Sequence, residues 1–373
     1  MPKDFTVTPW KVEGEIDYNR LIKDFGTESV EEKLLQRIKK HTGDLHYMLK
    51  RKIFFSHRDC NWLLDEYEKG NKFYLYTGRG PSGNTHLGHL VPWIFTKWLQ
   101  DKFDVDLWFQ LTDDEKFIFN DKLELSDTNR LAYENALDVI ALGFKKGKTK
   151  IFADTDYAKT LYSQAIRVAK RLTVSTTKAV FGLTDSDSVG KHFFTSVQSV
   201  PAFLPSVLAG KNIPCLIPHA IDQDPHFRVT RDIVHKLGYY KPAAIHCVFL
   251  PPLTGPGGKM SASAAETAVY TTDAPEVVEK KIRKYAFSGG KDTVEEHRKH
   301  GGNPDIDVSY QWLRFFEEDD KKLEKIYHDY KSGKLLSGEL KEILIEKLTK
   351  FLKKHQENRE KARKELDKFV IKD

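Results

Sequence analysis

From residue 73 onward, short apolar runs alternate with longer stretches whose apolar residues recur at helical spacing. The strand-like runs span residues 73–77, 107–112, 150–153, 215–218 and 243–250, and the helical stretches span about 86–103, 128–142, 161–172 and 226–237. Continuous apolar strands separated by helices are typical of a parallel sheet that is covered on both faces. The sequence therefore predicts an α/β fold built on a doubly wound parallel sheet.

The two ends of the chain lack this alternation, and 373 residues are too many for one hydrophobic core. Residues 1–72 are expected to form an N-terminal region appended to a sheet domain at 73–273, with charged helices at about 30–40 and 62–67. After residue 273 only helical patterns remain, at about 276–285, 309–316, 319–330 and 338–369. They predict a separate α-helical domain at 274–365, and we expect a C-terminal segment, 366–373, to pack back on the sheet domain.

Composition excludes several classes of protein. The three cysteines, Cys60, Cys215 and Cys247, are far apart, which argues against a disulfide framework or a zinc site and for a reducing compartment such as the cytoplasm. No run approaches the roughly 20 apolar residues that span a bilayer, and residues 1–5 lack the apolar core of a signal peptide. A net charge of +6 permits a nucleic-acid partner without requiring one.

The loop after the first predicted strand, Thr77-Gly78-Arg79-Gly80-Pro81-Ser82-Gly83, has the glycine spacing of a dinucleotide-binding turn. Pro81 removes a backbone N–H from the loop that would hold a pyrophosphate. The acidic residue expected at the end of the second strand also comes late, at Asp113 and Asp114. A dinucleotide enzyme is therefore the weaker interpretation of this loop.

Two histidines flank a small residue where the next helix is predicted to begin, in His86-Leu87-Gly88-His89. They are three residues apart in the first turn, so both face the same side. The helix N-terminus adds a positive field for phosphate oxygens, and Gly88 leaves room for a flat base against the backbone. Two solvated histidines at a helix start are the alternative interpretation. No third ligand is evident, so no metal site is predicted here.

Far downstream, the glycine- and proline-rich loop Gly255-Pro256-Gly257-Gly258 precedes Lys259-Met260-Ser261-Ala262-Ser263. A lysine in such a loop can follow phosphate groups as negative charge moves onto a leaving pyrophosphate. A surface lysine loop is the alternative interpretation. Both motifs are predicted at the carboxyl edge of the parallel sheet, where ligands bind in this architecture. Together they predict the activation of a carboxylate by ATP.

These two motifs and four longer strings resemble a known family. The strings are FYLYTGRGP at 73–81, QLTDDEK at 110–116, AIDQDP at 220–225 and AFSGG at 286–290. From about residue 4 to its end the chain resembles class I aminoacyl-tRNA synthetases, and among them the tryptophanyl-tRNA synthetases of the archaeal and eukaryotic type. The resemblance implies a Rossmann-like catalytic domain that activates L-tryptophan with ATP and Mg²⁺ and transfers it to tRNA(Trp). Ala262 replaces the second lysine of the general class I loop, a departure that this branch tolerates.

The resemblance also implies roles for particular residues. It assigns transition-state stabilisation to His86, His89, Lys259 and Ser261, and ATP binding to Arg79, Gly88, Lys116, Met260 and Ser263. It assigns the indole N–H to Tyr76 and Gln110, the substrate amine to Glu115 and Gln198, and the amine or carboxylate to Gln223. Indole has one donor and no acceptor, so a selective pocket needs a hydrogen-bond acceptor in an otherwise apolar slot. Without the resemblance, Gln110 and Gln198 would be read as ordinary polar residues.

The family resemblance further implies a homodimer, formed around the segment inserted at about 125–200. It also implies anticodon binding by the helical domain, where Arg283, Lys284, Tyr285 and Phe287 could contact phosphates and stack on bases or simply pack the helices. Tyrosyl-tRNA synthetase is the nearest alternative, because it shares the fold and both motifs. A small-molecule nucleotidyltransferase and a non-catalytic relative remain the more distant alternatives.

The lysine loop generates a direct prediction. Because Ala262 leaves Lys259 as the one ammonium of the Lys259–Ser263 motif, Lys259→Ala should lower the rate of tryptophan-dependent pyrophosphate exchange by roughly 10²-fold or more. The KM for tryptophan should change little, because the ammonium acts on the phosphates. Near-normal exchange by the variant would contradict the proposed role of Lys259.

Overall fold

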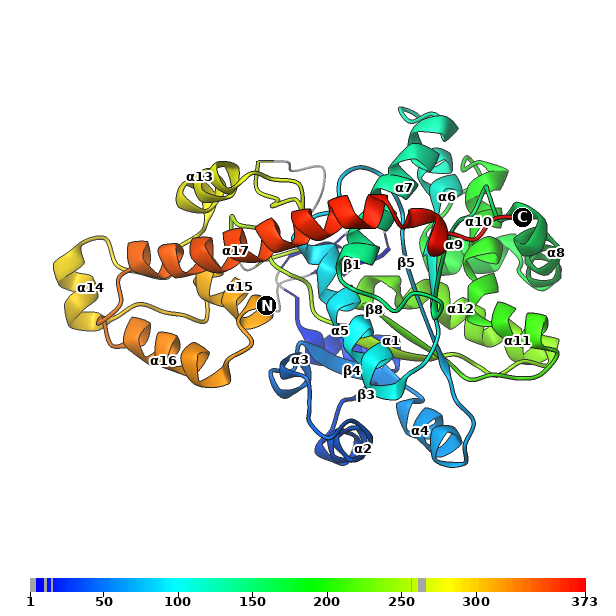
Figure 1. Ribbon diagram of the computed structural model, residues 1–373, viewed down its shortest axis with the longest axis horizontal. Helices are drawn as coiled ribbons and strands as arrows, with labels where there is room; N and C mark the ends of the chain where they lie inside the picture. Colours follow the sequence, from blue (N-terminus) through cyan, green and yellow to red (C-terminus); the bar gives the residue numbers. More distant parts are fainter. Residues whose placement is uncertain (1–4, 10–11, 15, 256, 261–265) are drawn as a thin grey trace.

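The computed structural model describes residues 5–9, 12–14, 16–255, 257–260 and 266–373, and its centre is a seven-stranded sheet (Figure 1). The strands are β3 (Glu28–Ser29), β4 (Phe54–Arg58), β9 (Ala243–Cys247), β8 (Cys215–Ala220), β5 (Tyr74–Arg79), β6 (Leu107–Leu111) and β7 (Thr149–Ala153), in that spatial order. The five strands from β5 to β9 are parallel to one another, whereas β4 pairs antiparallel with both β3 and β9. The predicted doubly wound parallel sheet is confirmed.

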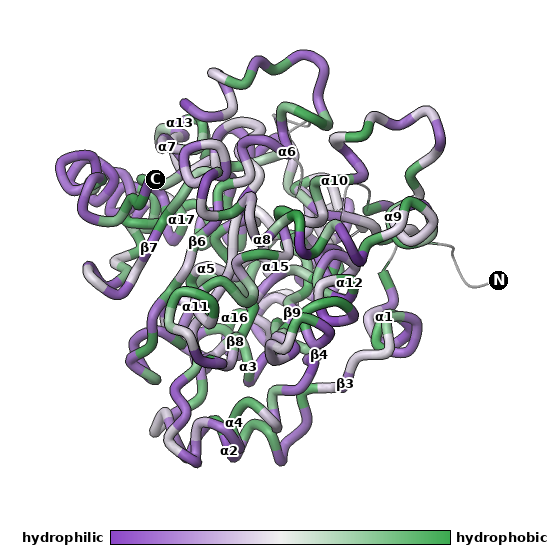
Figure 2. The backbone as a smooth tube through the Cα atoms, turned by 90° about the vertical axis from the view of Figure 1, so that its right-hand side faces the viewer, coloured by the Kyte–Doolittle hydropathy of each residue, from purple (hydrophilic) through white to green (hydrophobic). Residues whose placement is uncertain are grey.

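The sheet separates two hydrophobic cores, because successive side chains of a strand point to opposite faces. Leu75, Phe109 and Ile151 are fully buried in one core, with apolar residues of helices on that face. Tyr76, Phe152 and Ile217 are fully buried in the other core. Figure 2 shows the strands of the interior as largely hydrophobic and the surrounding helices as banded. A parallel sheet covered on both faces leaves the loops at its strand ends as the place for a site.

The helices of the sheet-containing part are α1 (Tyr18–Phe25), α2 (Glu32–Thr42), α3 (Tyr47–Lys50), α4 (Cys60–Glu68), α5 (Leu87–Phe103), α6 (Asp113–Ile118), α7 (Leu125–Ala141), α8 (Ala158–Ala169), α9 (Val174–Phe181), α10 (Val189–Gln198), α11 (Leu204–Ala209) and α12 (Asp224–Val234). Six of them, α2, α4, α5, α7, α8 and α12, lie where helical patterns are predicted, and α1, α3, α6, α9, α10 and α11 are additional. No described helix is both long enough and apolar enough to cross a membrane.

The structure corrects the domain boundary expected at residue 72. Strands β3 and β4 extend the sheet from within residues 1–72, and β4 pairs antiparallel with β9. Arg58 at the end of β4 donates to both carboxylate oxygens of Asp224 at 2.8 Å. Among the described residues of this region, the small hairpin of β1 (Thr6–Val7) and β2 (Val12–Glu13) forms a sheet of its own. Most of this region is therefore part of the sheet domain.

The helical domain extends from one end of the molecule, and its last helix runs back along the sheet domain (Figure 1). Its helices are α13 (Pro275–Tyr285), α14 (Val294–His300), α15 (Val308–Phe316), α16 (Asp320–Lys331) and α17 (Ser337–Arg363). The first half of α17 packs on α13 and α15, and its second half packs on α7. After α17, Val370 pairs with Ile151, so the C-terminal segment covers the exposed edge of β7. The helix α17 therefore belongs to both parts of the molecule.

A buried charge cluster holds α17 against α7. The Asp138 carboxylate of α7 lies 2.9 Å from both His355 Nε2 and Arg359 Nε of α17. All three side chains are buried, at 1 %, 2 % and 10 % exposure for Asp138, His355 and Arg359. Buried charges of this kind are tolerated only while each one keeps its partner.

Asp138→Ala should therefore destabilise the fold by about 3 kcal/mol, because it removes the carboxylate nearest to the buried Arg359 guanidinium and leaves only Glu134, at 3.4 Å. Urea unfolding measures this difference. Arg363→Ala is the matched control, since Arg363 pairs with Glu134 at the surface and its loss should cost less than about 1 kcal/mol. Equal effects of the two substitutions would contradict the structural role given to Asp138.

Candidate active site

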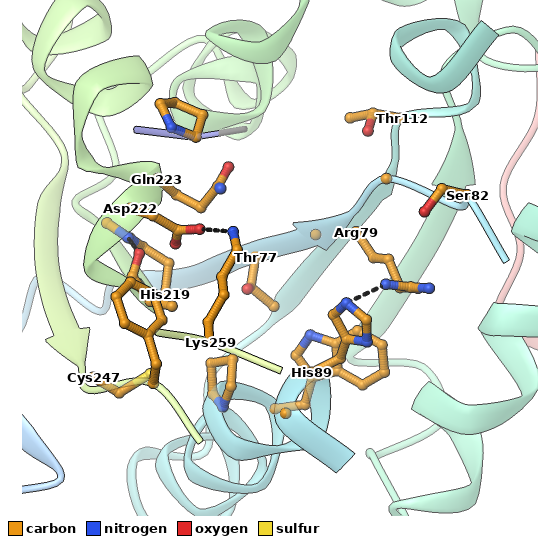
Figure 3. A pocket seen from close by; sticks show the side chains of 18 of the residues that line it. Thr77, Arg79, Ser82, His89, Thr112, His219, Asp222, Gln223, Cys247 and Lys259 are labelled. Atoms are coloured by element: carbon orange, nitrogen blue, oxygen red, sulfur yellow. Dashed lines mark hydrogen bonds and ion pairs between the residues drawn. The ribbon is translucent and has the colours of Figure 1, made fainter. Parts of the chain in front are cut away.

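One cavity of about 600 Å³ opens at the carboxyl ends of β5, β6 and β8, within the size range of small-molecule sites (Figure 3). Its apolar wall includes Trp93, Ile217, Phe227 and Phe249. Ten of the residues predicted from the sequence also line it: Arg79, His86, Gly88, His89, Glu115, Lys116, Gln198, Gln223, Lys259 and Met260. The structure therefore brings most of the predicted site together in one place.

The two sequence motifs meet because backbone hydrogen bonds join the segments beside them. Leu87 N donates to Val269 O at 3.0 Å, and Thr271 N donates to Thr85 O at 2.9 Å. The first bond also satisfies one of the N–H groups that an α-helix leaves free at its start. This pairing holds the start of α5 next to the segment that follows the lysine loop. Ser261 and Ser263 lie outside the described residues.

The guanidinium of Arg79 organises the loop between β5 and α5. It donates to Nε2 of His89 at 2.5 Å, to the carbonyls of Gly83 and Asn84 at 3.1 Å, and to Oδ1 of Asn135 on α7. Since Nε2 of His89 accepts this bond, the imidazole is neutral. Burial together with the charges of Arg79 and Lys259 holds the pKa values of His86 and His89 well below their usual range.

Neutral imidazoles suit phosphate oxygens as hydrogen-bond partners and leave the charge to other groups. The rings of His86 and His89 stack with centroids 3.5 Å apart. A Cβ at Gly88 would lie 3.1 Å from atoms of the His86 ring, so a larger residue would crowd it. The short motif at the start of α5 is therefore shaped by contacts between its own residues as well as by a ligand.

Lys259 reaches across the cavity to an acidic residue that the sequence analysis did not assign. Its Nζ lies 2.6 Å from Oδ2 of Asp222, which follows β8, and Figure 3 shows the two side chains pointing at each other. Asp222 lies within one of the strings that carry the family resemblance, which is the signal that could have identified it. The ammonium is thus directed into the cavity by a carboxylate on the opposite side.

Glu115 and Lys116 form a second ion pair at the wall of the cavity. Oε1 of Glu115 lies 2.7 Å from Nζ of Lys116, and Oε2 accepts from the hydroxyl of Thr112 at 2.8 Å. Burial opposes ionisation of Glu115, but Lys116 and Thr112 hold the pKa of its carboxyl below the usual value. A Cβ at Gly80 would lie 2.0 Å from Cε of Lys116 and 2.6 Å from Oε2 of Glu115, so a larger residue there would force these side chains to shift.

Tyr76 and Gln110 are placed behind the cavity wall and not on it. Both are fully buried, and neither lines the cavity. Gln198 lies between them and the open space, and its Nε2 donates to the Tyr76 hydroxyl at 3.2 Å. A ligand that reaches Tyr76 must therefore displace the amide of Gln198.

One group of histidine and acidic side chains among the described residues is close enough to hold a metal ion, namely His219, Asp224 and His246. Arg58 already donates to both oxygens of Asp224, and its positive charge would repel a cation. The geometry of this group is therefore that of a salt bridge with neighbouring imidazoles.

Comparisons with known proteins agree with this geometry. A family model described as tRNA synthetases class I (W and Y) matches residues 68–353. The tryptophan–tRNA ligase of Saccharolobus solfataricus is 54 % identical over 97 % of this chain and 94 % of its own length. The cytoplasmic tryptophan–tRNA ligase of Saccharomyces cerevisiae is 51 % identical over 99 % of this chain and 89 % of its own. The structure of Plasmodium falciparum tryptophanyl-tRNA synthetase superposes with a TM-score of 0.90 at 46 % identity, covering 95 % and 97 % of the two chains.

The site predicts an unusual acid–base behaviour for His89. Its ring should stay neutral in NMR spectra as the pH falls through the ordinary histidine value of 6.5, because burial and Arg79 disfavour the charged form. The unfolded chain takes up this proton below pH 6.5 and the folded chain does not, so the free energy of unfolding should fall as the pH drops below that value. His89→Gln should show a smaller fall. Titration of the folded ring near pH 6.5 would contradict the assignment.

Proposed function

The chain belongs to the class I tRNA synthetases of the tryptophan and tyrosine group, and on that premise we propose that it joins L-tryptophan to the 3′ end of tRNA(Trp) with ATP. We choose tryptophan as the amino acid because about half of the residues, over nearly the whole chain, are identical to those of tryptophan–tRNA ligases of archaea and yeast. The family model alone covers both tryptophan and tyrosine enzymes, so these relatives favour the first over the second.

The reaction begins with attack of the tryptophan carboxylate on the α-phosphorus of ATP. Pyrophosphate leaves, and tryptophanyl-adenylate remains in the site. The 2′-OH of the terminal ribose of the tRNA, as the family resemblance implies, then takes the tryptophanyl group and AMP leaves. Side chains of the protein form no covalent bond in either step, so catalysis consists of positioning and charge stabilisation.

The cationic part of the cavity supports the assignment of the ATP site. Arg79, Lys116 and Lys259 all line it, and His86 and His89 add uncharged imidazoles at the positive end of α5. We assign Lys259 to the negative charge that develops on pyrophosphate. Gly88 and Met260, which lie next to each other in the cavity wall, are assigned to the adenosine of ATP. Lys259 must exchange Asp222 for phosphate oxygens when ATP binds. Ser261 and Ser263 complete the assignment from the sequence motif alone.

The magnesium ion of the reaction enters the site bound to ATP. Glu115 and Asp222 are carboxylates of the cavity wall, and each is already paired with a lysine. Mg²⁺ prefers phosphate oxygens and water in sites of this kind. We therefore treat magnesium ATP as the substrate, with Lys116 and Lys259 as the protein groups nearest to its phosphates.

The tryptophan side of the cavity combines apolar and polar walls. Ile217 and Phe227 flank a space for the indole ring, and Gln198 and Gln223 offer amide groups to the amine and carboxylate. Glu115 is ionised and supplies the negative charge that an ammonium group requires. Tyr76 and Gln110 become the partners of the indole N–H once the side chain of Gln198 moves.

Several partners follow from the same proposal. The helical domain, with Arg283, Lys284, Tyr285 and the part-exposed Phe287, is assigned to the anticodon of the tRNA. A cytoplasmic location agrees with the yeast relative, which is a cytoplasmic tryptophan–tRNA ligase, and with the three free, buried cysteines. A homodimer would bury the exposed apolar side chains of α8–α10, namely Tyr162, Ile166, Val174 and Val189.

Pyrophosphate exchange with one amino acid at a time tests the proposed function. Exchange should occur with L-tryptophan and be lower with L-tyrosine by roughly 10⁴-fold, the discrimination that a site built around one hydrogen bond can reach. Exchange with L-tyrosine at a rate comparable to that with L-tryptophan would favour the alternative, a tyrosyl-tRNA synthetase. Exchange with neither amino acid would point to a non-catalytic relative.

A further inference from the structure

Three buried polar side chains join the ends of neighbouring strands beneath the cavity. Tyr76 lies on β5, Gln110 lies on β6, and Asp154 follows directly after β7. Nε2 of Gln110 donates to Oδ1 and Oδ2 of Asp154 at 2.8 and 3.0 Å, and the Tyr76 hydroxyl donates to Oε1 of Gln110 at 2.5 Å. Tyr76 and Gln110 are 0 % exposed and Asp154 is 3 % exposed, so water cannot replace these bonds.

Asp154 determines which group donates and which accepts in each of these hydrogen bonds. The two ends of a glutamine side-chain amide are almost identical in shape, so packing alone does not choose between them. A carboxylate oxygen that accepts turns the NH₂ of Gln110 toward Asp154 and leaves Oε1 for Tyr76. The Tyr76 proton is then donated inward, and a lone pair of its oxygen is left for the cavity side.

Gln198 marks the place where that lone pair is available. Its Nε2 can only donate, and it lies 3.2 Å from the Tyr76 hydroxyl oxygen. The backbone carbonyl oxygen of Gln198, 3.1 Å from the Tyr76 hydroxyl oxygen, is a second acceptor for the Tyr76 proton, but Oε1 of Gln110 is nearer. An N–H group of a substrate can take the position that the Gln198 amide holds.

Asp114 stabilises the arrangement from the far side of Asp154. The two carboxyl groups are hydrogen-bonded to each other. Burial and the charge of Asp113 raise the pKa of Asp114 to about 7, and burial and the charge of Asp114 raise the pKa of Asp154 well above its usual value. The pair therefore keeps a shared proton near neutral pH. Because that proton lies between the two carboxyl groups, the Asp154 oxygens that face Gln110 remain acceptors. Asp113 instead accepts from Thr155 and Asn129.

We propose that Asp154 is a positioning residue for substrate selection, which fixes Gln110 and Tyr76 so that an acceptor meets the indole N–H of tryptophan. The inference rests on the proposed function, since it names the substrate group that Tyr76 meets. It predicts rejection of β-(3-benzothienyl)alanine, an analogue in which sulfur replaces the indole N–H. That analogue has nearly the same shape but no donor for the lone pair of Tyr76.

Asp154→Ala tests the proposal, because it removes the acceptor that holds the NH₂ of Gln110, so that this amide is free to turn and present Nε2 to the Tyr76 hydroxyl. The kcat/KM for tryptophan in pyrophosphate exchange should fall about 10-fold or more, whereas that for the benzothienyl analogue should not fall. The preference for tryptophan over the analogue should therefore collapse. Asp156→Ala is the matched control, because Asp156 binds Tyr133 and Lys372 away from the cavity. This control should keep the preference of the original protein.

An unchanged preference in Asp154→Ala, or an equal loss for both substrates, would overturn the role of Asp154. If circular dichroism shows that Asp154→Ala does not fold, Asp154→Ser takes its place, since it also removes the buried carboxyl group. A collapsed preference in that variant supports the proposal and a retained one overturns it. Absence of tryptophan-dependent exchange in the original protein would instead overturn the proposed function.

Discussion

Parallel pairing of β5 with both β6 and β8 is the constraint on which the site depends. It places three strand ends side by side, so that side chains far apart in the sequence reach one cavity. The pairing is close: Gly78 lies opposite Gln110, and a Cβ on Gly78 would come within 2.6 Å of the Gln110 carbonyl oxygen. The same register sets Tyr76 next to Trp108, two residues before Gln110. A slip of one residue would turn Tyr76 and Gln110 toward the other core.

The cavity combines two electrostatic environments that ATP and an aromatic amino acid require. On the side of α5, Arg79 and Lys259 supply positive charge and keep His86 and His89 neutral. Beneath the other side, Asp114 and Asp154 form an acidic pair that retains a proton, so the two carboxyl groups carry one negative charge in place of two. In both places burial strengthens the electrostatic effect of a few groups. Within one small volume, Arg79 and Lys259 thus set the charge on the side of α5, and Asp114 and Asp154 set the direction of the hydrogen bonds on the other side.

Much of this molecule could be predicted from the sequence, and the exceptions share a physical cause. The five parallel strands are continuous apolar runs, and the histidine and lysine motifs are local, so both are readable along the chain. Strand β3 is two polar residues and β4 mixes Phe54 with His57 and Arg58, so neither carries a strand pattern; only their antiparallel pairing makes them strands. Likewise, Asp222 and Asp154 acquire their partners through tertiary contacts. Nothing in the local sequence predicts such contacts.

We infer that the hydrogen bonds beneath the cavity present an acceptor to the indole N–H of tryptophan. A crystal structure of the complex with L-tryptophan would show this contact. We expect the indole nitrogen within about 3 Å of the Tyr76 hydroxyl oxygen, with the Gln198 amide displaced and Gln110 still bound to Asp154. An indole ring bound elsewhere, with the bond between Gln198 and Tyr76 intact, would contradict the claim.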